Sequence, residues 1–243
     1  MDSFIIILTA LLPIAVFLWY IYYKDRKSPE PINELLKAFL YGVGAVPLSL
    51  CMSMPLKWMG VYSSEATNVL GCMSEAFFGA AIPEEIAKLF VLWMVLRKNR
   101  YFDENMDGIV YAVCVSLGFA ALENIMYLFS NTETYLSVGL ARAIFAVPGH
   151  FCFGILMGYY YSLAKFYPKS TIKNKALVLI APILVHGLYD SILFIINVTP
   201  AVSGILLIVF LVFCRKMWKY GSKKIKEHLE RDNDRNCQYD CSI

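Results

Sequence analysis

The sequence reads Pro83-Glu84-Glu85-Ile86-Ala87-Lys88 near the middle of an apolar run that covers residues 66–96. A membrane-spanning helix needs roughly 20 apolar residues, so these two carboxylates and one ammonium are expected deep in the hydrocarbon layer. A charged group at that depth costs several kcal/mol unless it is paired or lines a water-filled cavity. We therefore interpret this stretch as the centre of a functional site inside a membrane.

The composition of the chain agrees with a membrane setting. Of its 243 residues, 58% are hydrophobic and only 17% are charged, which is too apolar for a soluble domain. We predict an all-α, polytopic helical bundle that is embedded in the lipid bilayer and has no nucleic-acid partner. A single transmembrane domain is expected over residues 1–218, followed by a polar cytoplasmic tail over residues 219–243.

The distribution of basic residues predicts the topology. Cytoplasmic loops carry an excess of Lys and Arg, and with the N-terminus outside, the outer loops hold only Lys57. We therefore predict about seven transmembrane helices, with the N-terminus out and the C-terminus in. The apolar segments cover residues 4–23, 34–55, 66–96, 107–129, 138–164, 176–196 and 201–218.

Titratable side chains from four of these segments fall at similar depths. With a rise of about 1.5 Å per helical residue, they lie roughly 15 to 24 Å from the cytoplasmic ends of their helices. Unrelated structural residues would have no reason to share a depth, so we predict that they form one site. The residues are Glu84, Glu123, His150, His186 and Asp190.

Spacing within the helices supports the same site. Lys88 follows Glu84 by four residues and Glu85 by three, so its ammonium can reach either carboxylate. Asp190 follows His186 by four residues, so it can orient the imidazole and stabilise its protonated form. Pro83 removes a backbone hydrogen bond and is expected to kink the helix directly before the glutamates.

Structural roles for the same residues stay open at this point. The glutamates and Lys88 could form a structural ion-pair cluster, and Glu123 could tie helices together by hydrogen bonding. Arg142 could serve as a snorkelling anchor near the outer end of its helix. His228 lies in the charged C-terminal segment, where we expect it to be solvated.

Three motifs resemble the signature motifs of the PrsW family of intramembrane proteases. They are Glu84-Glu85-x-x-Lys88, Phe119-x-x-x-Glu123 and His186-x-x-x-Asp190, in order and on separate segments. The resemblance covers roughly residues 81–193. The related group of type II prenyl-protein (CAAX) endopeptidases and abortive-infection proteins has Arg after its Glu-Glu pair and His in place of Glu123. Lys88 and Glu123 therefore favour the PrsW branch.

The resemblance implies a function and a substrate. It implies site-1 cleavage of a single-span anti-sigma factor, which activates an extracytoplasmic-function sigma factor during envelope stress. It also implies a multi-pass protein of the bacterial plasma membrane. A CAAX-type endopeptidase-like protease is one alternative. A proton- or cation-coupled transporter is another, because buried acids and histidines also build ion relays. Transporters commonly carry paired broken helices, and the sequence shows only one such break.

The expected chemistry is hydrolysis of a peptide bond by a water that Glu84 and Glu85 activate. One glutamate takes the proton, and Lys88 fixes the shared charge of the pair. His186, oriented by Asp190, stabilises the oxyanion or protonates the leaving amine, while Glu123 and His150 complete the wall of the site.

The sequence favours a mechanism without a metal or other cofactor. It has no His-Glu-x-x-His motif, and the ammonium of Lys88 disfavours a cation nearby. A zinc-dependent alternative has enough oxygen and nitrogen ligands. Those ligands would come from Glu84, Glu85, Glu123, His150 and His186.

Overall fold

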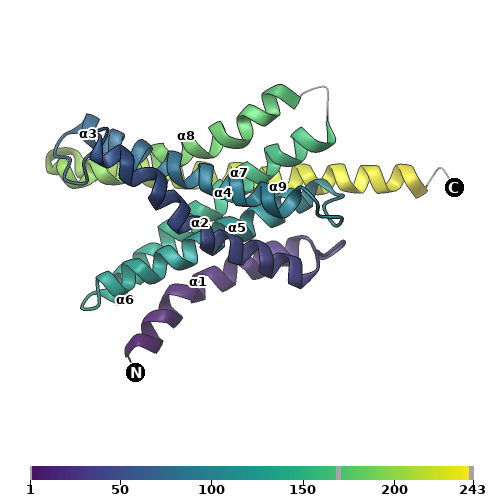
Figure 1. The fold of residues 1–243 in the computed structure, drawn as a ribbon, viewed down its shortest axis with the longest axis horizontal. Helices are drawn as coiled ribbons and strands as arrows, with labels where there is room; N and C mark the ends of the chain where they lie inside the picture. The colour runs from purple at the N-terminus through teal and green to yellow at the C-terminus, as the bar shows by residue number, and fades with distance from the viewer. Residues whose placement is uncertain (1, 168–170, 241–243) are drawn as a thin grey trace.

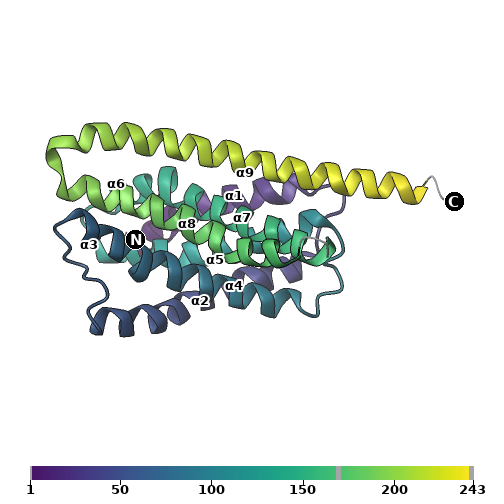
Figure 2. The same ribbon diagram turned by 90° about the horizontal axis from the view of Figure 1, so that it is seen from above.

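The computed structural model describes residues 2–167 and 171–240, and every regular element in that part of the chain is helical. The helices form an elongated bundle, with the last helix lying along one face and extending beyond the others (Figures 1 and 2). The elements are α1 (Asp2–Lys24), α2 (Ile32–Trp58), α3 (Val69–Ser74), the π-helical η1 (Glu75–Ala81), α4 (Ile82–Leu96), α5 (Asn105–Ser130), α6 (Tyr135–Ala141), the π-helical η2 (Arg142–Ala146), α7 (Val147–Phe166), α8 (Thr171–Val198), the 3-10 helical η4 (Pro200–Val202) and α9 (Ser203–Asp240).

Helix α5 is the core of the bundle. Its apolar residues cover every side, which is typical of a helix that is surrounded by others. It packs against α1, α2, α4, α7 and α9. In its most apolar stretch, 78% of the residues are buried, compared with 22% in α1 and 6% in α9. Helix α5, which carries Glu123, is therefore held in position by the helices around it.

Glycines allow the helices next to α5 to approach its backbone closely. A Cβ atom added to Gly42 on α2 would lie 2.0 Å from the carbonyl oxygen of Val115 on α5. A Cβ atom added to Gly158 on α7 would lie 2.2 Å from the carbonyl oxygen of Gly108. Small residues at helix crossings are a common packing device in membrane proteins, and these crossings set the depth of α5 against its neighbours.

Six helical segments in the described part of the chain are long and apolar enough to cross a membrane. The all-helical, multi-pass architecture is as predicted, but the count is one lower than the seven predicted spans. The difference lies in residues 66–96, which form α3, η1 and α4 in direct succession. Their longest piece, α4, has only 15 residues. The interruption falls where Pro83 was expected to disturb the helix.

A second interruption was not expected from the sequence. The π-helical segment η2 ends directly before α7, whose second residue is Pro148. The pattern repeats that of η1 and Pro83, because in both places a π-helical segment leads into a helix with proline in its first turn. The sequence argument that a single break disfavours a transporter therefore fails.

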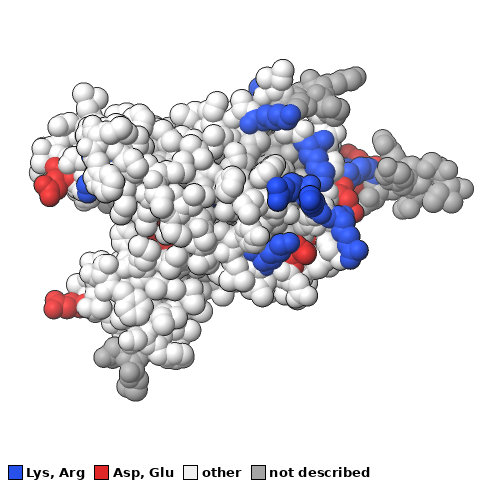
Figure 3. Space-filling view, in the orientation of Figure 1, with Lys and Arg blue, Asp and Glu red and all other residues white. Residues whose placement is uncertain are grey.

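Lys and Arg gather at the end of the bundle from which the C-terminus projects (Figure 3). This is the end that we predicted to face the cytoplasm. The orientation of the bundle in a membrane stays a prediction.

Helix α9 continues without a break past residue 218 to Asp240. Its later part packs against α5 and α7. The expectation that His228 is solvated is wrong, because its side chain is fully buried. The imidazole stacks on Tyr159 with ring centroids 4.3 Å apart, and its Nε2 atom lies 3.1 Å from the Tyr159 carbonyl oxygen.

Candidate active site

The residues predicted for the site come together in one polar cluster. Helices α4, α5, α7 and α8 each contribute to it. The cluster consists of Glu84, Glu85 and Lys88 on α4, Glu123 on α5, His150 on α7, and His186 and Asp190 on α8. The π-helical segments η1 and η2 end just before the cluster residues of α4 and α7, and such segments are frequent at functional sites.

Lys88 lies at the centre of the cluster and is 1% exposed. Its Nζ atom lies 3.1 Å from Glu84 Oε2 and 2.8 Å from Glu85 Oε1, and it is 3.3 Å from His150 Nδ1. It also lies 4.2 Å from the ring centroid of Phe119, which gives this motif residue a cation–π role. A buried ammonium is tolerated only when its donors are satisfied, and here two carboxylates and a ring nitrogen satisfy them.

The tautomer of His150 follows from its neighbours. Because the Lys88 ammonium has no acceptor, a hydrogen bond between them requires His150 Nδ1 to accept. The proton of a neutral imidazole then lies on Nε2, which is 2.8 Å from Glu123 Oε2 and donates to it. His150 is therefore a neutral ring that accepts a hydrogen bond from Lys88 and donates one to Glu123.

Arg142 belongs to the site, although the sequence left it as a possible anchor. Its Nη2 atom forms an ion pair with Glu123 Oε2 at 3.0 Å, but the two groups are not aligned for a hydrogen bond. Its Nε atom donates to Asn124 Oδ1 at 2.6 Å, and its guanidinium lies 4.2 Å from the ring centroid of Tyr127. Arg142 is the first residue of η2, and the spacing of the motifs gives no signal for it.

His186 bridges two acidic residues of the cluster. Its Nδ1 atom lies 2.9 Å from Glu85 Oε1, and its Nε2 atom lies 3.2 Å from Asp190 Oδ2. Carboxylates on both sides of the ring favour an imidazolium, which donates from Nδ1 to Glu85 and forms an ion pair with Asp190 through Nε2. The ring stacks on Phe153 with centroids 4.5 Å apart, which fixes its plane. The predicted pairing of His186 with Asp190 is present.

The two adjacent glutamates have different surroundings. Glu84 lines a cavity of about 290 Å³ together with Glu123, His150, His186 and Asp190, whereas Glu85 does not line it. The Glu85 side chain is 1% exposed, against 14% for Glu84. Glu85 Oε1 accepts from both Lys88 and His186, and Glu85 Oε2 is buried without a partner in the described part of the chain. Glu84 therefore faces the cavity, with Glu85 behind it.

The family model described as PrsW family intramembrane metalloprotease matches residues 30–215. The chain belongs to the PrsW protease family. A protease PrsW of Clostridioides difficile is 33% identical over 91% of this chain and 90% of its own length. A protease PrsW of Bacillus subtilis is 35% identical over 92% and 95%, and one of Oceanobacillus iheyensis is 40% identical over 74% and 79%. No solved structure matches the chain.

Membership of the PrsW family settles the class of the protein. It is an intramembrane protease, a hydrolase of peptide bonds, with several membrane-spanning helices. This finding decides against the transporter alternative, and the recognition made from the three motifs is confirmed.

The PrsW family description names a metalloprotease, and the polar cluster holds a group of side chains that could bind a metal ion. Glu84, Glu85 and His186 each offer one ligand atom, and these atoms lie within 4.8 Å of one another. Two carboxylates and an imidazole are ligands that zinc accepts in catalytic sites, and the unpartnered Oε2 atom of Glu85 is a spare donor. The residues therefore fit a divalent cation. Glu123 and His150 are not part of this group, and Lys88 holds the same carboxylates.

Proposed function

We propose that this PrsW-family protease performs site-1 cleavage of a single-span anti-sigma factor and so activates an extracytoplasmic-function sigma factor in envelope-stress signalling. The location proposed for this reaction is the plasma membrane of a bacterium. The single observation that carries the catalytic part is the division of the glutamate pair. One carboxylate faces the cavity, and the other lies buried between Lys88 and His186.

Glu84 is the general base in this proposal. Its Oε2 atom lies 4.0 Å from His186 Nε2, so a water in the cavity can contact both. Glu84 takes a proton from this water as the oxygen bonds to the carbonyl carbon of the substrate. The carbon–nitrogen bond then breaks, and Glu84 returns the proton to the leaving amine.

The surrounding charges position Glu84 and support the reaction. Glu85 holds Lys88 and His186 in place and carries the compensating negative charge. His186 stabilises the oxyanion, because its imidazolium is oriented by Asp190 and Glu85. Glu123, with His150 and Arg142, forms the opposite wall of the cavity.

A divalent cation, when bound, would be held by Glu84, Glu85 and His186 and would act as a Lewis acid that lowers the pKa of a bound water. We nevertheless expect cleavage to persist after treatment with a chelator, because Lys88 and the His186 imidazolium already neutralise the two carboxylates. The measurement is cleavage by purified protein before and after chelation, with the zinc content determined in parallel. Loss of cleavage and its recovery on adding zinc would contradict this expectation. One bound zinc per chain, lost in His186→Ala, would place the metal at this group.

The catalytic roles are tested by substitution. Glu84→Gln and His186→Ala are expected to reduce cleavage by about 10²-fold or more, because each removes a group that acts in the transition state. Glu85→Gln is expected to reduce cleavage as well, because Lys88 and His186 lose their shared acceptor. A single-span anti-sigma factor is co-expressed with each variant, and the shortened product is measured by immunoblot.

The control is Glu65→Gln, which changes an exposed glutamate outside the cluster and should leave cleavage intact. Each variant must accumulate to the normal level. Undiminished cleavage in Glu84→Gln and His186→Ala would refute the proposed mechanism and leave the polar cluster with a structural role.

A further inference from the structure

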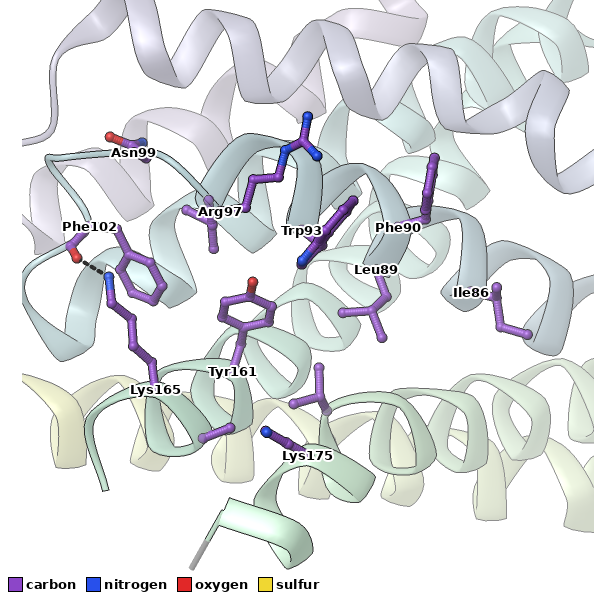
Figure 4. Close-up of a pocket in the computed structure, with 13 residues that line it drawn as sticks. Ile86, Leu89, Phe90, Trp93, Arg97, Asn99, Phe102, Tyr161, Lys165 and Lys175 are labelled. Carbon is purple, nitrogen blue, oxygen red and sulfur yellow. Dashed lines mark hydrogen bonds between the residues drawn. The ribbon is translucent and has the colours of Figure 1, made fainter. Parts of the chain in front are cut away.

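A second cavity lies outside the polar cluster, toward the end of the bundle where the basic residues gather. It measures about 680 Å³, which is within the range of ligand pockets, roughly 300 to 1,000 Å³. Its walls come from α4, the segment that follows α4, α7 and α8. Figure 4 shows Trp93 and Leu89 on α4 facing Tyr161 on α7 across the cavity.

The body of this cavity is apolar and faces the membrane. Phe90 and Trp93 on α4 are 49% and 45% exposed, so the bundle itself does not cover them. Together with Ile86, Leu89 and Val178 they give a surface suited to hydrocarbon. Helix α4 is part of the apolar run of residues 66–96, so these side chains are at a depth where the surrounding medium is lipid.

Three cations surround one end of the cavity: Arg97 directly after α4, Lys165 on α7 and Lys175 on α8. Their charged groups lie on different sides of the cavity (Figure 4). In the described part of the chain, no carboxylate oxygen lies within 4.0 Å of the charged nitrogens of these residues. Lys165 donates to the Phe102 carbonyl, and Arg97 lies 4.8 Å from the Trp93 ring centroid, so neither contact neutralises the charge.

Uncharged donors lie at the same cavity. Asn99 lines it, and the Nδ2 atom of Asn99 is buried without a hydrogen-bond partner in residues 2–167 and 171–240. The Tyr161 hydroxyl points from α7 toward α4 (Figure 4). The cavity therefore has three positive charges around one end of an apolar groove and the Tyr161 hydroxyl in its wall.

We propose that this cavity binds an anionic phospholipid, with the acidic headgroup at the end that Arg97, Lys165 and Lys175 surround and an acyl chain along Trp93, Leu89 and Ile86. Basic pockets between transmembrane helices on the cytoplasmic side are known to hold acidic headgroups. A single-span protein substrate fits less well, because its cytoplasmic flank carries an excess of Lys and Arg that these cations repel.

The bound lipid has a structural consequence for the polar cluster. The cavity lies between α4 and α8, the helices that carry Glu85 and His186, in their halves nearer the basic end of the bundle. A phospholipid that contacts both helices fills the gap between them. It thereby supports the pairing of Glu85 Oε1 with His186 Nδ1 at 2.9 Å.

The test uses the full chain in detergent micelles with equal amounts of phosphatidylglycerol and phosphatidylcholine of the same acyl chains. Native mass spectrometry measures which lipid stays bound. We expect phosphatidylglycerol to be retained in preference. The combined variant Arg97→Gln, Lys165→Gln, Lys175→Gln should retain about tenfold less of it, because each cation near an anionic headgroup adds to the binding.

The matched control neutralises three exposed cations that do not line the cavity, Lys98→Gln, Lys173→Gln and Lys219→Gln. It lowers the net charge equally and should keep the lipid. Thermal unfolding checks that both combined variants fold. Equal retention of the two lipids by the unchanged protein, or an equal loss in both variants, would overturn the proposal. Preferential retention of a basic single-span peptide would overturn it as well.

A second measurement places the lipid. Vesicles that contain brominated phosphatidylglycerol or brominated phosphatidylcholine quench tryptophan fluorescence on contact. A variant that keeps only Trp93, with Phe at positions 19, 58 and 218, reports on the cavity. We expect stronger quenching by the brominated phosphatidylglycerol, and the difference should vanish in the Arg97, Lys165 and Lys175 variant. Equal quenching by both lipids would assign the bound lipid to another surface.

Discussion

Glu84 and Glu85 are adjacent in the sequence, but their side chains lie in different environments. Successive residues on a helix point in directions about 100° apart, so neighbours seldom share a role. Glu84 reaches the cavity, while Glu85 turns into the protein toward Lys88 and His186. Replacing one member of a buried charge pair leaves the other uncompensated, at a cost of about 3–5 kcal/mol. The ion pair between Glu85 and Lys88 therefore matters for the stability of the protein as well as for the proposed reaction.

Asp25 is a buried acid outside the membrane-spanning segments, and its burial affects how the stability of the protein depends on pH. It is 3% exposed, and its Oδ2 atom has no partner in the described part of the chain. Burial, together with the nearby charge of Glu30, raises the pKa of Asp25 to about 8. The same burial raises the pKa of Glu30. The folded protein therefore binds a proton at Asp25 that the unfolded chain has released.

This difference predicts how stability changes with pH. A raised pKa in the folded state gives a stabilisation that is complete below the unfolded value, 3.8, and is lost as the pH rises through about 8. The temperature of unfolding in detergent should therefore fall between pH 6 and pH 9. Asp25→Asn imitates the protonated form and should reduce that fall. Asp234→Asn, at an exposed position, is the control and should not change it. The same slope in Asp25→Asn and the unchanged protein would show that Asp25 is ionised when folded.

At the scale of the elements, two helices of the site begin in the same way. A π-helical segment followed by proline precedes Glu84 in α4 and His150 in α7. Proline lacks an N–H group and so leaves the preceding turn without its regular hydrogen bond. Each break lies beside the cavity that the polar side chains of the other helices also line. The sequence carried a signal for the second break, since Pro148 precedes His150 much as Pro83 precedes Glu84.

The contact between α2 and α5 predicts opposite effects for two glycines on one helix. Gly42→Ala should destabilise the protein, because its Cβ atom would lie 2.0 Å from the Val115 carbonyl oxygen. Gly44→Ala should stabilise it by about 0.5–1 kcal/mol, because its Cβ atom meets no described atom within 4 Å and alanine favours a helix. Thermal unfolding of the two purified variants is the measurement. Equal effects of the two substitutions would refute the close packing of α2 on α5.

At the scale of the whole molecule, the sequence was sufficient to predict the helical architecture and the polar cluster. A fixed rise per residue converts sequence position into depth, so titratable residues on four separate helices could be placed in one layer. Side-chain direction between helices has no such rule. The sequence therefore did not reveal that Arg142 joins Glu123, that Glu84 and Glu85 face differently, or that His228 is buried against Tyr159. These depend on tertiary contacts.

Asp232 on α9 also has a bearing on the order in which the chain folds during synthesis. Its carboxylate accepts hydrogen bonds from the backbone N–H groups of Asn105 and Met106, 127 and 126 residues earlier, at 2.8 Å each. These are first-turn groups of α5, which have no partner within the helix. Until the ribosome has translated Asp232, the first turn of α5 has only the local capping box of Glu104 and Asp107. The first turn of the central helix is therefore completed only after Asp232 has been synthesised.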